Sequence, residues 1–134
     1  MLLVYVTFPQ EGHLRDAPDA TQAAPERPCG LEAVRRLARE LVEARLAAGI
    51  NILPGALSVY RWQENIHEAA ELVLLAQVSR AAFADFRAHV LARHPHDVPC
   101  ITALPIADGN AAFLRWIEEN SLPLRHGISH PQPL

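Results

Sequence analysis

The sequence contains no lysine, and every one of its formally charged basic side chains is an arginine. This absence excludes a catalytic Schiff-base lysine and a phosphate-binding P-loop lysine. Glycine is also scarce, with 6 residues in 134, and neither of the common glycine-rich nucleotide-binding motifs occurs. The chain is therefore not expected to bind a nucleotide through such a loop.

Positive charge and long apolar runs are also lacking. The net charge is −3, whereas a nucleic-acid-binding domain needs clustered positive charge. No apolar run approaches the roughly 20 residues of a membrane span, and the first residues do not resemble a signal peptide. The two cysteines, Cys29 and Cys100, are too few for a disulfide framework. We therefore expect a cytoplasmic globular protein with neither nucleic acid nor membrane as a partner.

The apolar patterns that are present predict a single α+β domain over residues 1–120. Gly49 is expected to end the first helix, Ser79 and Asn110 to cap the next two, and Pro54-Gly55 to interrupt the second strand. The order βαββαβ plus a C-terminal helix is the ferredoxin-like split βαβ arrangement. A proline-rich insertion at 11–29 and a tail at 121–134 lack any pattern. The expected strands cover 3–8, 50–62, 66–78 and 99–106, and the expected helices cover 31–48, 80–93 and 111–119.

Several short motifs, taken in order, resemble the CutA divalent-cation-tolerance family. The matching stretches are 6–9 (VTFP), 41–55 (LVEARLAAGINILPG), 58–62 (SVYRW), Ile66, Glu68, Glu71, 94–95 (HP), Pro99, Ile101, 104–109 (LPIADG) and 113–117 (FLRWI). This resemblance covers about residues 2–119 except the insertion. It implies a homotrimer in which the middle hairpin crosses onto the neighbouring subunit. It also implies a response to divalent metal ions through binding or scaffolding, without enzymatic activity.

The resemblance further implies copper binding in some members, through a cysteine of the first strand and histidines near the end of the second helix. Of those positions only His94 is retained here, because Val6 and Arg93 stand at the others. The split βαβ topology suggests a different set of candidate metal ligands. It brings the end of the second helix and the start of the last strand to one end of the domain, with the hairpin tip expected nearby. His94, His96 and Cys100 are therefore candidate ligands for weakly bound Cu²⁺ or Zn²⁺.

Each candidate has a simpler interpretation as well. The histidines can be solvated loop residues hydrogen-bonded to backbone, and Cys100 can pack as a small apolar group. Tyr60 and Trp62 stand two apart and so share one strand face, either as a wall of a small-ligand site or as a hydrophobic anchor between subunits. The interpretation as a ligand wall favours a PII-like sensor with a small ligand in an inter-subunit cleft. A thiol-dependent or hydrolytic enzyme using Cys100 and His94 is a third hypothesis, although no nucleophile and base are paired by spacing.

Overall fold

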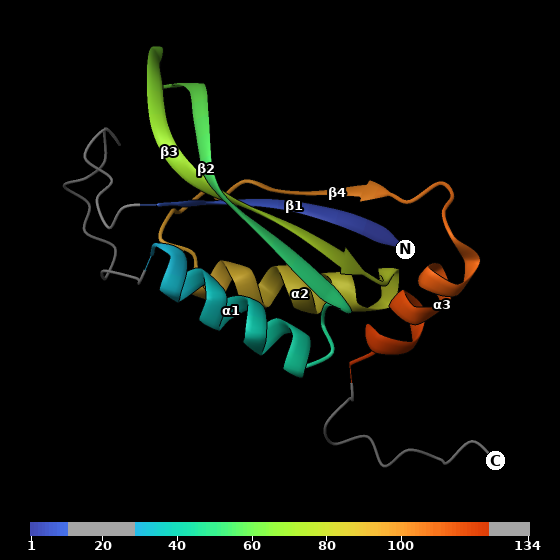
Figure 1. The fold of residues 1–134 in the computed structure, drawn as a ribbon. Coiled ribbons are helices and arrows are strands. Elements are labelled where there is room, and N and C mark those ends of the chain that lie inside the picture. Colours follow the sequence, from blue (N-terminus) through green and yellow to red (C-terminus); the bar gives the residue numbers. More distant parts are fainter. Residues whose placement is uncertain (11–28, 124–134) are drawn as a thin grey trace.

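The computed structural model describes residues 1–10 and 29–123 (Figure 1). The order of its elements confirms the predicted βαββαβ arrangement with a terminal helix. The predicted insertion, apart from Cys29, and the tail from residue 124 onward lie outside the described residues. The elements are β1 (Leu2–Pro9), α1 (Leu31–Glu43), β2 (Gly49–Trp62), β3 (Asn65–Val78), α2 (Arg80–Arg93), β4 (Ile101–Pro105) and α3 (Ala111–Asn120).

The four strands form one antiparallel sheet in the order β2-β3-β1-β4. β1 is central and pairs with β3 from Leu2↔Val78 to Pro9↔Glu71. α1 and α2 cover one face of the sheet, and α3 lies at the end where β2 begins (Figure 1). This is the split βαβ topology that the sequence predicted.

The core lies between the sheet and the two helices that cover it. Alternate residues of β1 and β3 point to this side, as the twofold repeat of a strand requires. They meet the apolar stripe of α1 and the core-facing residues of α2. The main buried side chains are Val4, Val6, Phe8, Leu37, Leu41, Leu72, Leu74, Phe86 and Val90.

No helix covers the opposite face of the sheet within the described residues. On this face Leu3, Tyr5, Val73 and Leu75 are only partly buried. In the single chain the end of β3 is therefore fully buried on one side only. The reason is that no second layer of the described structure packs there.

The predicted caps of the later helices are confirmed. The Ser79 hydroxyl accepts the backbone N–H of Ala82 at 3.1 Å, and the Asn110 side chain accepts that of Ala112 at 3.0 Å. These bonds satisfy donors that the first turn of a helix leaves free. α2 therefore covers 80–93 as predicted.

The predicted end of the first helix at Gly49 is wrong, because α1 ends at Glu43. Arg45 takes a left-handed conformation with φ 61°. The residue that adopts this conformation after a helix is usually glycine. The N–H of Leu46 then donates to the carbonyl of Leu41 at 2.9 Å, and both side chains are buried. This is the long bond of a Schellman motif, which turns the chain toward β2.

The Arg45 side chain connects this turn to the C-terminal end of α3. Its guanidinium donates to the carbonyls of Glu119 and of Leu122, the latter at 3.4 Å. A buried pair of serines lies beside it, where the N–H of Ser79 donates to the hydroxyl of Ser121 at 2.8 Å. Polar bonds, and not only apolar packing, therefore hold α3 against the body of the domain.

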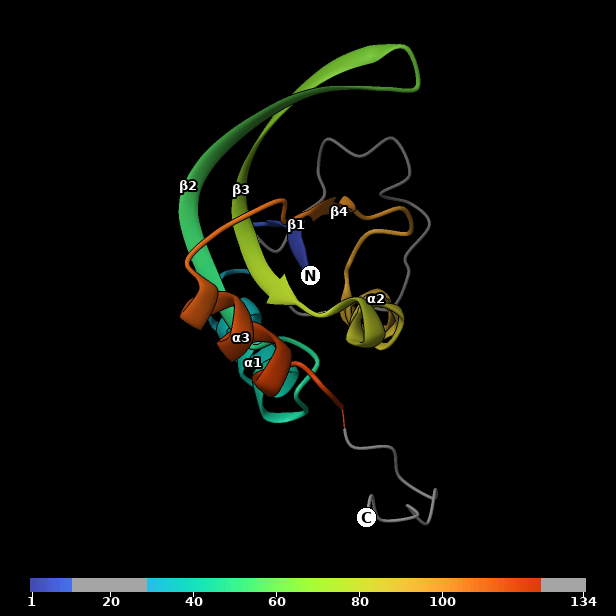
Figure 2. The same ribbon diagram turned by 90° about the vertical axis from the view of Figure 1, so that its right-hand side faces the viewer.

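β2 and β3 continue beyond the sheet as a two-stranded hairpin, whose residues 56–70 we call the arm (Figures 1 and 2). The turn at its tip consists of Gln63 and Glu64, with φ 48° and 70°, the positive pair typical of a tight type I′ hairpin. The pairing register shifts between Leu53 and Ala56, which confirms the predicted interruption at Pro54-Gly55 as a bulge. The tip projects away from the body (Figure 1). The prediction that it lies near the end of α2 is therefore wrong.

Candidate functional site

His94 ends α2 and is 1% exposed, so this predicted ligand lies in the protein interior. Its Nε2 lies 2.7 Å from the carbonyl oxygen of Thr7, and its Nδ1 lies 3.0 Å from the backbone nitrogen of His96. The carbonyl can only accept and the amide can only donate. The ring is therefore neutral, with its proton on Nε2.

Aromatic contacts reinforce this placement. The centroid of the His94 ring lies 4.2 Å from that of Phe8 and 5.2 Å from that of His96. Phe8 comes from β1, where strand alternation points it toward the helices. The end of β1, the end of α2 and the following segment therefore meet at one place, as the topology predicted.

His96 follows in the segment between α2 and β4 and is half-buried. Burial lowers the pKa of its imidazole below the ordinary 6.5, although the negative charges of Glu71 and Asp97 oppose this shift. The neutral form is therefore favoured near pH 7, and a neutral imidazole is the form that binds transition metals.

Cys100 is exposed with a free thiol, and its carbonyl accepts the N–H of Thr7 at 3.4 Å. Cys29 lies just before α1 and is half-buried. The structure thus brings His94, His96 and Cys100 to one end of the domain. Within residues 1–10 and 29–123, however, no group of three ligating side chains converges on one point.

Tyr60 and Trp62 lie on the arm and are 38% and 37% exposed. Tyr60 stacks on His67 of the opposite strand, with ring centroids 5.5 Å apart. Both aromatic side chains are therefore accessible in the single chain. Their role as a ligand wall or as an anchor stays a prediction.

The arm also carries strongly exposed aliphatic side chains. Leu57 is 67% exposed, Val59 60% and Ile66 59%. A small protein rarely leaves such a group in water unless the group meets a partner. The arm and the uncovered sheet face together form an extended apolar surface.

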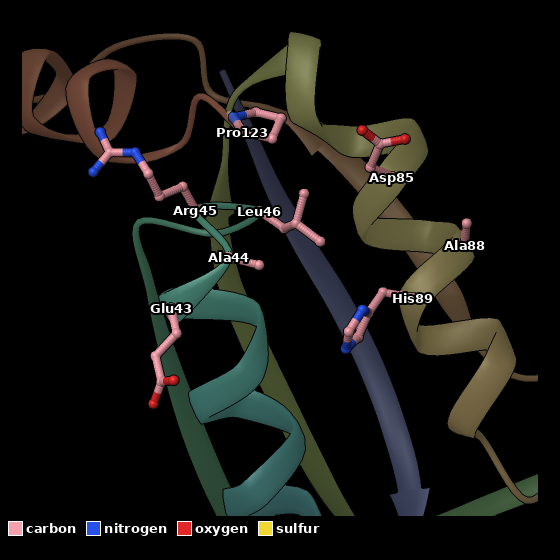
Figure 3. A pocket seen from close by; sticks show the side chains of 8 residues that line it. All are labelled: Glu43, Ala44, Arg45, Leu46, Asp85, Ala88, His89 and Pro123. Atoms are coloured by element: carbon pink, nitrogen blue, oxygen red, sulfur yellow. The ribbon is translucent and has the colours of Figure 1, made fainter. Parts of the chain in front are cut away.

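A hollow of about 640 Å³ lies between the end of α1 and α2 (Figure 3). Leu46 and His89 point into the space between the helices, whereas Glu43 points away from it (Figure 3). The charged groups do not converge, so the hollow offers no evident chemistry. Its lining residues are Glu43, Ala44, Arg45, Leu46, Asp85, Ala88, His89 and Pro123.

An ion-pair cluster that sequence analysis missed joins the same two helices. One carboxylate oxygen of Glu40 lies 3.0 Å from Nε2 of His89 and 2.9 Å from Nε of Arg93. The hydrogen bond from His89, helped by the Arg93 charge, lowers the pKa of Glu40 below its ordinary 4.5. No sequence signal connects the two helices here, because residues 40 and 89 are far apart along the chain.

Among the described residues, none of the helices has the length and apolar character of a membrane span.

A βαββαβ sheet with helices on one face and a long projecting hairpin defines a ferredoxin-like α+β protein. Comparisons with known proteins identify the family more closely. The sequence model of the CutA1 divalent ion tolerance protein matches residues 29–120. This chain therefore belongs to the CutA1 family.

Individual relatives agree with this assignment. A divalent-cation tolerance protein CutA from Thermus thermophilus is 49% identical over 67% of this chain and 87% of its own length. A chloroplastic protein CutA 1 from Oryza sativa is 38% identical over 67% of this chain, but over only 51% of its own length. The names of relatives indicate different compartments, since a solved CutA from Archaeoglobus fulgidus is described as periplasmic.

Solved structures of relatives share the fold. The Cut A1 protein from Thermus thermophilus has a TM-score of 0.72 at 40% identity and covers 90% of this chain and 99% of its own. CutA1 from Oryza sativa has a TM-score of 0.71 at 32% identity, with 90% and 93% covered. These matches confirm the predicted fold class.

Proposed function

We propose that this protein acts in tolerance of divalent metal ions as a cytoplasmic homotrimer, by binding or scaffolding and without catalysis. The observation that supports assembly is the exposed apolar arm beside an uncovered sheet face. In a closed ring of three copies, each arm meets a different surface of the next copy, so the contacts are repeated without leaving an open end. Such an interface should bury more than about 2,000 Å² in total.

A polar atom on the arm supports the same proposal. Nε2 of His67 is enclosed but has no hydrogen-bond partner among the described residues. Buried polar groups in native proteins are nearly always hydrogen-bonded, because an unsatisfied group retains its desolvation cost. A neighbouring copy seated on the arm is a source of the missing partner.

The proposed metal contact is the segment from His94 to Cys100. Its imidazole and thiol groups suit Cu²⁺ or Zn²⁺ better than Mg²⁺ or Ca²⁺. Few ligands from one chain should give only weak binding. The small number of cysteines is in keeping with the proposed cytoplasmic location.

The geometry argues against the enzyme hypothesis. A histidine that activates a thiol needs a ring nitrogen free to accept its proton. Both ring nitrogens of His94 already have backbone partners, from Thr7 and His96. His94 is therefore not available as a base for Cys100.

Two measurements on the purified chain test the proposed function. Light scattering should give three times the chain mass of 14.8 kDa at micromolar concentration, and a stable folded monomer would refute the trimer. Calorimetric titration should detect Cu²⁺ or Zn²⁺ and no Mg²⁺. Binding of a nucleotide or small anion in place of these metals would support the PII-like sensor instead.

A further inference from the structure

We propose that Asp108 and Gly109 form a modification site, at which the aspartate isomerises spontaneously to isoaspartate through a cyclic imide. The two residues lie in the loop 106–110 between β4 and α3 (Figure 1). Both are exposed, and neither belongs to a helix or strand. The reaction needs only groups of this chain and water, so it does not depend on the proposed metal binding.

The chemistry takes place in two steps. The backbone nitrogen of Gly109 attacks the side-chain carboxyl carbon of Asp108 and forms a C–N bond. The amide proton and the carboxyl hydroxyl leave together as water, and a five-membered succinimide ring results. A second water then opens the ring at the backbone carbonyl of residue 108. The main chain now runs through the former side-chain carboxyl carbon, which is the connectivity of isoaspartate.

The loop already holds the reacting groups together. Oδ1 of Asp108 accepts the backbone N–H of Gly109 at 2.8 Å. The carboxyl carbon is one covalent bond from that oxygen, so little further ordering is needed before attack. Gly109 has no side chain to shield its nitrogen. Among the described residues this N–H makes no other hydrogen bond, so ring closure removes none that connects the loop to the rest of the domain.

Two other pairs in the described structure lack one of these features. Asp97 is also exposed, but the β-branched side chain of Val98 crowds the nitrogen that would attack. Asparagine can form the same ring with loss of ammonia, which makes Asn120 a second candidate. There the attacking nitrogen belongs to Ser121, whose N–H donates to the carbonyl of Ile117 at 2.9 Å. Neither pair therefore combines an unshielded nitrogen with freedom from the fold, as the loop 106–110 does.

Isomerisation has a local consequence for α3. It adds one methylene group to the main chain directly before the Asn110 cap, which accepts the N–H of Ala112 at 3.0 Å. A Cβ placed on Gly109 would lie 3.2 Å from Cδ2 of Leu114, so the loop also packs closely on the first turn of this helix. Amide hydrogen exchange at residues 112–114 should therefore be faster in the isomerised fraction. Unchanged exchange would contradict this consequence.

The test is prolonged incubation of the native full chain at neutral pH, followed by digestion with trypsin. The chain contains no lysine, so trypsin cuts only after arginine and releases residues 94–115 as one peptide. This peptide contains both Asp97 and Asp108, which makes Asp97 an internal control. Electron-transfer fragmentation distinguishes the two isomers, and it should find isoaspartate at residue 108 and none at residue 97. Equal amounts at both positions, or none at residue 108, would overturn the inference.

A synthetic peptide of residues 104–112 supplies the rate in the absence of the fold. The native rate should lie within roughly tenfold of the peptide rate, because misplacing the reacting atoms by about 1 Å can cost roughly 100-fold. A slower native rate would show that the fold blocks ring closure, which would refute the proposal.

Two variants test the geometry of the loop directly. Gly109→Ala should slow isomerisation several-fold, since its methyl group shields the nitrogen and meets only the flexible end of Leu114, so the domain still folds. Asp108→Asn should form the same ring faster than the parent and lose ammonia, which mass spectrometry detects. An isomerisation rate unaffected by Gly109→Ala, or a native Asp108→Asn chain that keeps its ammonia, would count against the site.

Discussion

Replacing Trp62 by alanine should weaken assembly of the proposed trimer without unfolding the subunit. Trp62 is 37% exposed in the single chain. For a side chain with about 250 Å² of surface, this leaves about 90 Å² to be covered by a neighbour. At about 25 cal/mol per Å², burial of that area is worth about 2 kcal/mol per copy, or about 6 kcal/mol for three copies.

This free energy corresponds to a roughly 10⁴-fold change in the monomer–trimer equilibrium constant. Because that constant scales with the square of concentration, the midpoint of dissociation should move to roughly 100-fold higher protein concentration. Sedimentation equilibrium over a dilution series measures the shift. Val42→Ala is the matched control, since Val42 is 39% exposed but lies on α1, away from the arm. A Trp62→Ala trimer that dissociates at the same concentration as the parent would refute the reasoning.

Three further predictions concern the subunit itself and are measured by denaturant unfolding. Arg45→Ala should destabilise the fold. Arg45→Gly should be about 1 kcal/mol more stable than Arg45→Ala, because glycine adopts the left-handed conformation without strain. Equal stabilities of the two variants would contradict the turn geometry. Ser121→Ala should cost about 1–3 kcal/mol, since it leaves the buried N–H of Ser79 without its acceptor, and an unchanged midpoint would argue against that bond. The lowered pKa of Glu40 means that its contribution to stability is present above about pH 4.5 and is lost as pH falls through the folded value. Glu40→Gln should therefore make stability less dependent on pH in that acid range, and an unaltered pH profile would show that the carboxylate contributes nothing.

Local sequence signals account well for the elements of this fold. Ser79 and Asn110 cap helices where their side chains predicted, and the alternation in β1 and β3 identifies the face that covers the core. The bulge at Pro54-Gly55 also follows from residue chemistry. These features depend on neighbours within a few positions, so one sequence is enough to predict them.

Features that depend on distant backbone could not be predicted in this way. An arginine at position 45 gives no sign that it occupies a left-handed turn, because its side chain binds carbonyls at and just beyond the end of α3, more than 70 residues away. The two bonds of His94 were equally hidden. His94-x-His96 resembles a ligand pair, yet one imidazole is committed to the carbonyl of Thr7, 87 residues earlier.

The bulge that separates the arm from the sheet has a consequence for the specificity of the proposed assembly. None of the residues 56–70 belongs to the buried core, whose first member in β3 is Leu72. Substitutions in the arm therefore leave the folding of the domain almost untouched while they change the surface offered to another copy. Two related chains made in the same cell could be kept from mixing by differences confined to this hairpin, each arm accepting its own kind and rejecting the other.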